Sequence, residues 1–145
     1  MIPVLNLTLM LFLNEKLLMM KIKQITFGSD HTAAILADGS IACWGYNADG
    51  QCDVPTGIGS AVSIAVGGFH TVALLKDGSV VCWGRNDDRQ CDVPEFADTV
   101  VSVAAGDDYT VAVLADGSLV SWGDEQYQRD IETRLVFKQI ELENY

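Results

Sequence analysis

Four cysteines are the residues whose spacing first suggests chemistry in this sequence. Cys43 and Cys52 lie nine positions apart, and Cys82 and Cys91 repeat that spacing. Cysteines on neighbouring strands can form a disulfide when their Cβ atoms approach to about 4.5 Å, whereas in a reducing compartment they serve as small buried apolar residues. Both interpretations stay open. A structural zinc site is disfavoured, because such sites prefer close CxxC-like pairs.

His31, His70 and Tyr109 occupy one position of a repeated pattern, each 39 residues after the last. A ring of such groups is one way to hold a metal ion, but only two are imidazoles and no acidic third ligand is in register. We therefore expect the histidines to hydrogen-bond to a neighbouring repeat unit, beside the threonine that follows each of them. The pattern shows no nucleophile with an adjacent base and no phosphate-binding loop, so we expect no catalysis, metal or cofactor.

The histidines belong to a repeat of 39 residues that covers most of the chain. Glycine and tryptophan recur at that spacing without gaps, at Gly28, Gly67, Gly106, Trp44, Trp83 and Trp122. The repeat divides the chain into an apolar N-terminal segment (1–21), blade 1 (22–60), blade 2 (61–99), a degenerate blade 3 (100–138) and a tail (139–145) that begins a fourth repeat. The N-terminal segment is too short to span a membrane and lacks the basic start and cleavage site of a signal peptide, so we favour a degenerate strand or a start artefact. Secretion or a membrane anchor stays open as the alternative.

Each repeat indicates short strands and tight turns. Residues 70–75 alternate with the period of two that is typical of a strand, and Asp77-Gly78 predicts a two-residue hairpin of type I′. The segment SVVCWG returns, and CDVP predicts a short outer strand that Pro94 ends. Four short antiparallel strands per repeat predict an all-β fold of β-propeller-type blades. We expect the recurring glycines where blades crowd together, and the tryptophans packed between blades with their N–H groups bonded to a carbonyl.

The pattern VxxVAxGxxHTVALxxDGSVVCWGxNxxxQ resembles the regulator of chromosome condensation repeat, over residues 22–124. The resemblance implies blades of a propeller that generally has seven of them. It also implies binding to another protein, because members of this family act in nucleotide exchange on small GTPases, in ubiquitin ligases, in light sensing and as enzyme inhibitors. The fold itself does not identify which protein is bound.

The number of repeats departs from that pattern, because only about three are present and propellers have about four to eight blades. In the third repeat DEQYQRDIE replaces RNDDRQCDV. A partial array of three blades belongs to a larger propeller, closes against a second copy as a homodimer, or is capped by the apolar segments at its two ends. We favour the first interpretation.

The charge of the chain restricts its partners. The formal net charge is −11, and residues 22–123 contain four Lys or Arg against thirteen Asp or Glu. This balance disfavours nucleic acid and favours a basic protein surface. The loop after each Trp-Gly pair varies on a constant frame, so we predict partner-binding residues there, namely Tyr46, Arg85, Arg89 and Tyr127.

These observations predict a non-enzymatic protein–protein interaction module or scaffold. We expect it not to bind membranes and to be located in the cytoplasm or nucleus. The resemblance adds three alternatives. The first is a guanine nucleotide exchange factor for a small GTPase. The others are the substrate-recruiting part of a ubiquitin ligase and a secreted enzyme inhibitor.

Overall fold

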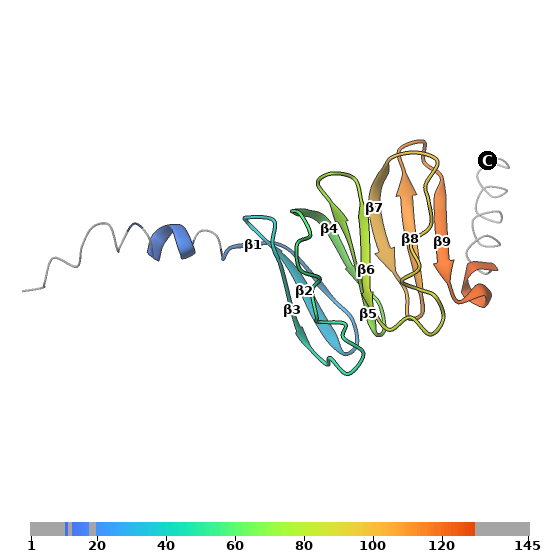
Figure 1. The fold of residues 1–145 in the computed structure, drawn as a ribbon, viewed down its shortest axis with the longest axis horizontal. Coiled ribbons are helices and arrows are strands. Elements are labelled where there is room, and N and C mark those ends of the chain that lie inside the picture. The colour runs from blue at the N-terminus through green and yellow to red at the C-terminus, as the bar shows by residue number, and fades with distance from the viewer. Residues whose placement is uncertain (1–10, 12, 18–19, 130–145) are drawn as a thin grey trace, which may run out of the picture.

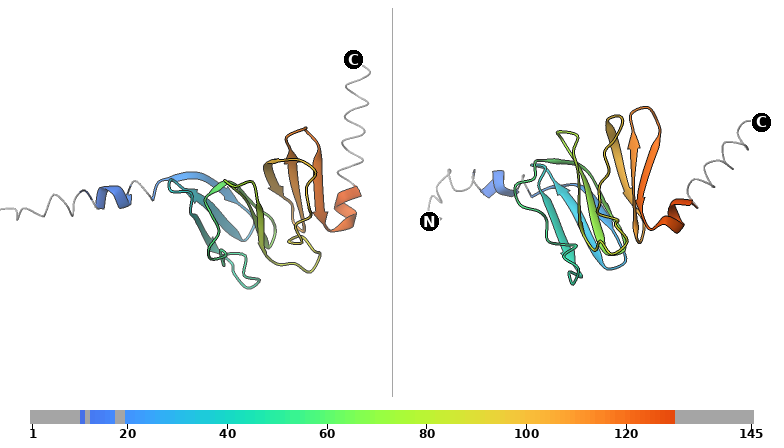
Figure 2. Two further views of the ribbon diagram at one scale, coloured as in Figure 1. Left: turned by 45° about the horizontal axis from the view of Figure 1, so that its top comes forward. Right: turned by 45° about the vertical axis from the view of Figure 1, so that its right-hand side comes forward.

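The computed structural model describes residues 11, 13–17 and 20–129, which form three small β-sheets standing side by side (Figures 1 and 2). Each sheet has three antiparallel strands in sequence order. The strands are β1 (Ile22–Phe27), β2 (His31–Leu36) and β3 (Ile41–Gly45) in blade 1; β4 (Ala61–Val66), β5 (His70–Leu75) and β6 (Val80–Gly84) in blade 2; and β7 (Val100–Ala105), β8 (Tyr109–Leu114) and β9 (Leu119–Gly123) in blade 3. This is the expected all-β array of propeller-type blades, and the described part of the chain does not close into a ring.

The fourth strand predicted for each blade is not formed in blades 1 and 2. The CDVP segments at 52–55 and 91–94 follow turns and do not pair with a sheet. In blade 1 the N–H of Asp53 donates to the carbonyl of Gly50 at 3.0 Å, and that of Val54 donates to Cys52 at 3.0 Å. These donors are therefore used within the turn itself, and the proline that follows has no N–H to add to a ladder.

The hairpin turns also differ from the predicted type I′ geometry. In blade 2 the N–H of Leu75 donates to Ser79 at 2.9 Å and that of Gly78 donates to Leu75 at 3.0 Å, so the loop has three residues. Gly78 alone in this loop has a positive φ, of 90°, which describes a type I turn followed by a left-handed glycine. Asp77 accepts hydrogen bonds from the N–H and the hydroxyl of Ser79 at 2.9 and 2.6 Å. The repeated Asp-Gly-Ser sequence is thus explained by this turn.

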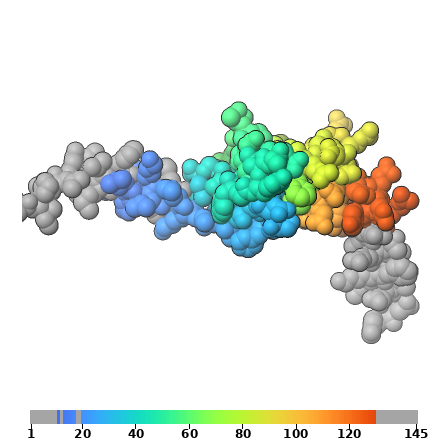
Figure 3. Space-filling model, turned by 90° about the horizontal axis from the view of Figure 1, so that it is seen from below, coloured from blue at the N-terminus to red at the C-terminus, as the bar shows by residue number. Residues whose placement is uncertain are grey.

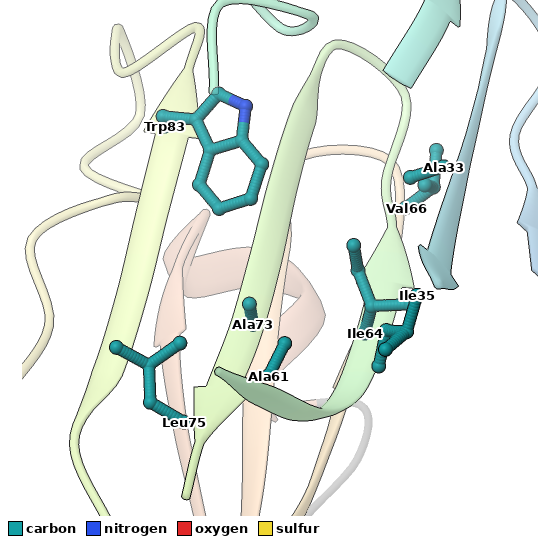
Figure 4. Close-up of a cluster of buried hydrophobic side chains, with 8 residues drawn as sticks. All are labelled: Ala33, Ile35, Ala61, Ile64, Val66, Ala73, Leu75 and Trp83. Carbon is teal, nitrogen blue, oxygen red and sulfur yellow. The ribbon is translucent and has the colours of Figure 1, made fainter. Parts of the chain in front are cut away.

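The hydrophobic core lies between the blades. Each blade is a single sheet that can bury its apolar residues only against its neighbours, and two apolar clusters fill the two interfaces. Figure 4 shows the first, in which Ala33 and Ile35 of β2 lie next to Val66 and Ile64 of β4. The indole of Trp83 closes one end of this cluster.

Two short helical stretches flank the blades in the described structure. Residues 13–17 are helical and exposed, and they project away from blade 1 (Figure 1). Residues 125–129 form a helical turn directly after β9. Neither stretch approaches the length and apolar character needed to cross a membrane. The C-terminal segment that the sequence analysis considered as a cap lies outside the described residues.

Candidate protein-interaction face

One end of the blades carries two loops from each repeat, and we call this end the loop face. Its loops are 28–30 and 46–51 of blade 1, 67–69 and 85–90 of blade 2, and 106–108 and 124–129 of blade 3. The backbone joins the two loops within each blade, since the N–H of Tyr46 donates to Asp30, that of Arg85 to Phe69 and that of Asp124 to Asp108, at 2.8–2.9 Å. The loop face lies at the lower end of the blades in Figure 1 and is turned towards the viewer in Figure 3.

A buried hydrogen-bond chain joins blade 1 to blade 2 beneath these loops. The Nε2 atom of His31 lies 2.9 Å from Oγ1 of Thr71. That hydroxyl donates to the backbone carbonyl of Gln51 at 2.9 Å, and the indole N–H of Trp83 donates to the same carbonyl at 2.9 Å. Because the hydroxyl proton is already used, His31 donates from Nε2 and is held in that tautomer. Both lone pairs of one carbonyl are thus satisfied by the next blade.

The second interface repeats this chain with one difference. His70 Nε2 lies 2.9 Å from Oγ1 of Thr110, which donates to the carbonyl of Gln90 at 2.7 Å. The indole N–H of Trp122, however, is buried without a hydrogen-bond partner in the described structure. Burial lowers the pKa of His70 to about 4, with a smaller contribution from the neighbouring His31. His70 is therefore neutral at pH 7.

The glycine that ends the first strand of blade 2 lies where no side chain fits. A Cβ atom on Gly67 would stand 2.2 Å from Cε1 of His70 and 2.5 Å from the carbonyl oxygen of Gly106 in the next blade. Gly106 has the same relation to the ring of Tyr109, at 2.1 Å from its Cε1. The close approach of the His ring and the next blade thus requires glycine at this position of the repeat.

The loop after β3 is held by hydrogen bonds from its own Asn and Gln side chains. Asn47 Oδ1 accepts from the N–H of Cys52 at 2.8 Å, and Asn47 Nδ2 donates to Asp53 at 2.8 Å. The buried Gln51 accepts from the N–H of Asp49 at 2.9 Å through its Oε1. Asn86 and Gln90 make the corresponding bonds in blade 2. Asn and Gln recur at the repeat spacing in blades 1 and 2, which is the sequence signal of this structural role.

Two of the predicted partner-binding residues come together on the loop face. The ring of Tyr46 packs edge-on against Phe69, with centroids 6.1 Å apart, and the guanidinium of Arg85 lies 5.7 Å from the centroid of the same ring. Arg85 also forms an ion pair with Asp87 at 3.0 Å. Sequence reasoning missed Phe69. This aromatic residue stands in blade 2 where the equivalent residues of blades 1 and 3 are Asp30 and Asp108.

The other two predicted residues lie farther along the loop face. Tyr127 stacks on Tyr109, with ring centroids 5.5 Å apart, within blade 3. Arg89 is exposed and has a φ of 62°. It lines a shallow cleft between the outer loops of blades 2 and 3, whose other walls are Asp87, Asp88, Gly123, Asp124 and Glu125.

Carboxylates dominate the charge of the loop face. Its loops contain eight acidic residues, Asp30, Asp49, Asp87, Asp88, Asp107, Asp108, Asp124 and Glu125, against the three arginines Arg85, Arg89 and Arg129. Burial and, next, the negative charge of Asp88 raise the pKa of Asp108. Burial is the larger of these two causes, and the positive charge of Arg85 opposes both. Within residues 20–129 no three potential metal ligands cluster.

The cysteine pairs lie at the outer edge of blades 1 and 2. The Sγ atoms of Cys43 and Cys52 are 3.0 Å apart, as are those of Cys82 and Cys91, and all four thiols are free. Burial, with the adjacent thiol, raises the pKa of Cys43 to about 12. The hydrogen bond with Cys91, with burial, raises the pKa of Cys82 as well. Cys43 and Cys82 are therefore protonated at neutral pH. The oxidation of either pair to a disulfide stays a prediction.

Comparison with known proteins agrees with the repeat. The family model described as Regulator of chromosome condensation (RCC1) repeat matches residues 22–51, 61–90 and 100–129. A search of curated proteins finds no match.

Several solved structures share the fold. The ectodomain of the receptor kinase CR4 from Physcomitrella patens is 28% identical with a TM-score of 0.63, covering 70% of this chain and 29% of that one. The ectodomain of the receptor kinase ACR4 from Arabidopsis thaliana is 27% identical with a TM-score of 0.60, covering 70% and 36%. Prp20p from Saccharomyces cerevisiae, described with its binding properties to Gsp1p and histones, is 26% identical with a TM-score of 0.61, covering 70% and 33%.

This chain spans about a third of the length of these solved relatives. The three segments that match the family model coincide with the three blades and make up more than half of the sequence. The chain therefore belongs to the regulator of chromosome condensation repeat family.

Proposed function

We propose that this chain is a non-enzymatic protein-interaction module that forms part of a larger propeller, and that its loop face binds a basic segment of another protein. The observation that carries the proposal is the group of Tyr46, Phe69 and Arg85, which stands among the carboxylates of the loop face. Aromatic and arginine side chains are enriched in protein interfaces, and Tyr and Arg are enriched among the few residues that supply most of the binding energy. The surrounding carboxylates favour a partner of opposite charge.

The strongly shifted pKa of the buried His70 has a structural cause and requires no catalytic role. Residues with strongly shifted pKa values often mark active sites. Here His70 is fully buried between blades and hydrogen-bonded to Thr110, so its shifted pKa follows from its place in the blade interface.

A cytoplasmic or nuclear location stays a prediction.

Nucleotide exchange on a small GTPase is the second candidate function. It is favoured by the similarity to Prp20p, which is described as binding Gsp1p. The test is the release of a fluorescent guanine nucleotide from a purified small GTPase with and without this chain. Our proposal expects an unchanged release rate, and an acceleration of tenfold or more would favour exchange instead.

The binding proposal is tested with a fluorescent peptide of Lys, Arg and Tyr, measured by fluorescence polarisation. The informative variant is Phe69→Asp, which places on blade 2 the residue type found at the equivalent positions Asp30 and Asp108. If Phe69 anchors the partner, this variant weakens binding about tenfold although it adds negative charge. If binding were charge attraction alone, the same variant would strengthen it, and the proposed site would be wrong.

A matched pair of variants tests the location of the charge. Asp107→Asn with Asp88→Asn removes two charges from the loop face, and Glu95→Gln with Asp98→Asn removes two from the loop between blades 2 and 3 at the opposite end. We expect the first pair alone to weaken binding and to reduce its salt dependence. Equal effects of the two pairs would contradict binding at the loop face.

A further inference from the structure

Blade 1 exposes on its outer side the residues that blades 2 and 3 bury. Trp44 is 47% exposed, whereas Trp83 and Trp122, 39 and 78 residues later, are each 7% exposed. Phe27 is 71% exposed, whereas Val66 at the same position of blade 2 is 8% exposed. In Figure 1 this side of blade 1 is turned away from the other two sheets. The described structure thus leaves one side of blade 1 without the neighbour that the repeat provides elsewhere.

Ile22 and Ile25 complete the apolar part of this surface. They are 55% and 42% exposed, whereas their equivalents Ala61 and Ile64 are 2% and 3% exposed. Contiguous exposed apolar residues on a sheet mark an interaction site. We call the surface formed by Ile22, Ile25, Phe27, Thr32 and Trp44 the outer face of blade 1.

Two polar groups on this face repeat those that blade 2 turns toward blade 1. Thr32 pairs with Trp44 across β2 and β3, in the register by which Thr71 pairs with Trp83 in blade 2. Thr71 is fully buried, accepts from a histidine of the preceding blade and shares a carbonyl acceptor there with Trp83. Thr32 and Trp44 therefore present the same acceptor and the same two donors. No described residue stands in front of them in the place of His31 and Gln51.

We propose that the outer face of blade 1 binds a further blade of the same repeat, one that carries His at the position of His31 and the Asn- and Gln-held loop of residues 46–51. The histidine of that blade donates to Thr32, and the carbonyl of its Gln accepts from Thr32 and Trp44. The argument is the continuity of this face with two interfaces that the structure already contains. The inference deepens the proposed place in a larger propeller and does not depend on what the loop face binds.

Blade 3 of a second copy lacks the required groups. Tyr109 stands in place of the histidine, and its ring stacks on Tyr127. Arg129 stands in place of the Gln, and residues 125–129 are helical where blades 1 and 2 have the Asn- and Gln-held loop. The outer face of blade 1 therefore discriminates between a blade with His and Gln and the blade 3 of its own chain.

The experiment uses a variant of the full chain whose blade 3 carries the required His and loop, and mixes it with the unaltered chain. A donor variant carries Tyr109→His and the sequence RNDDRQ of residues 85–90 in place of residues 124–129. It also carries Thr32→Val and Trp44→Ala, so that it cannot accept a second donor. The unaltered chain is the acceptor. We expect light scattering to show two separate monomers and, on mixing, a complex of twice the 15.7 kDa of one chain.

Acceptor variants test the named contacts. Thr32→Val in the acceptor leaves the histidine donor of the incoming blade unpaired, so we expect at least tenfold weaker binding. Val101→Ala, at an exposed residue of β7, is the matched control and leaves binding unchanged. Acrylamide quenching of Trp44 fluorescence falls when the donor binds. Circular dichroism and thermal melts establish that each variant is folded.

Three results would overturn the inference. The first is a folded donor and acceptor that stay monomeric on mixing, and the second is a complex that Thr32→Val does not weaken. The third is self-association of the unaltered chain that Thr32→Val abolishes, since the occupant would then be a second copy. If the full donor does not fold, the experiment uses a second donor that keeps the native loop and carries only Tyr109→His, Thr32→Val and Trp44→Ala. We expect this donor to bind more weakly, and Thr32→Val in the acceptor must still weaken its complex. None of these results bears on the peptide assay of the loop face.

Discussion

Blades 1 and 2 differ from blade 3 in one loop, although the three sheets have the same construction. Each first strand has its register shift after its first residue, at Ile22, Ala61 and Val100. After the Trp-Gly pair the blades diverge. In blades 1 and 2 an Asn and a Gln hold the loop, whereas in blade 3 Asp124 accepts from the N–H of Gln126 at 2.7 Å and begins a helical turn.

This difference teaches that the sheet of a blade does not depend on the loop that follows it. The loop instead determines which hydrogen-bond acceptor the blade presents to its neighbour. The backbone carbonyl of Gln51 or Gln90 in this loop accepts a hydrogen bond from the threonine of the next blade. Blade 3 has the threonine and the tryptophan that face blade 2. It lacks the histidine and the Gln that would hydrogen-bond to a fourth blade. The predictions below test this separation between the frame and the contacts across blades.

The largest effect is expected at the glycine where the blades meet. Gly67→Ala places a Cβ atom 2.2 Å from the ring of His70 and 2.5 Å from the backbone of Gly106, so strands of two blades must shift. We expect a loss of about 3 kcal/mol or more in the free energy of unfolding, measured in urea. Gly59→Ala, where nothing lies within 4 Å, is the control and changes stability by less than about 0.5 kcal/mol. Similar losses for the two variants would mean that the blades are not packed as described.

The same substitution at equivalent threonines compares a closed blade interface with an open one. Thr71→Val removes the acceptor of His31 inside the interface and should cost about 2 kcal/mol. Thr32→Val changes the outer face of blade 1, which is partly exposed, and should cost less than about 0.5 kcal/mol. Denaturant unfolding of both variants gives the difference. An equal cost would show that the outer face is covered within the isolated chain.

The histidine position predicts a dependence of stability on pH. Burial lowers the pKa of His70 from 6.5 to about 4, so the unfolded chain takes up this proton first as the pH falls. The stability is therefore full above pH 7 and is lost progressively between pH 6.5 and pH 4. From pH 7.5 to pH 5 we expect a loss of about 2 kcal/mol, to which the lowered pKa of His31 adds in the same direction. His70→Gln should flatten most of this slope, and an unchanged slope would assign it to other groups.

The sequence predicted the parts of the fold that repeat. The 39-residue spacing identified the blades. Alternation in residues 70–75, together with the Asp-Gly turns, identified strands that the structure contains. The sequence did not predict that CDVP lies outside the sheet. The N–H groups of Asp53 and Val54 can bond either within the turn or to a neighbouring strand, and β-propensity does not determine which of the two forms.

The candidate site was predicted only in part, for a different reason. Variation among the loops indicated Tyr46 and Arg85, but their common contact Phe69 comes from another loop that only the fold brings beside them. The asymmetry between Trp83 and Trp122 is likewise invisible in the sequence, where both stand at one repeat position. One indole N–H has a carbonyl acceptor, and the other is buried without one in the described structure.

The smallest predicted effect tests that asymmetry. Trp83→Phe removes the hydrogen bond to Gln51 and should destabilise the chain by about 1 kcal/mol more than Trp122→Phe, which removes only an unpaired donor. The two indoles are equally buried, so the apolar part of the change cancels in the comparison. Equal losses in urea unfolding would mean that Trp122 also finds an acceptor. The contacts of blade 3 with blade 2 would then match those of blade 2 with blade 1, and the difference between the blades would be confined to the loop face.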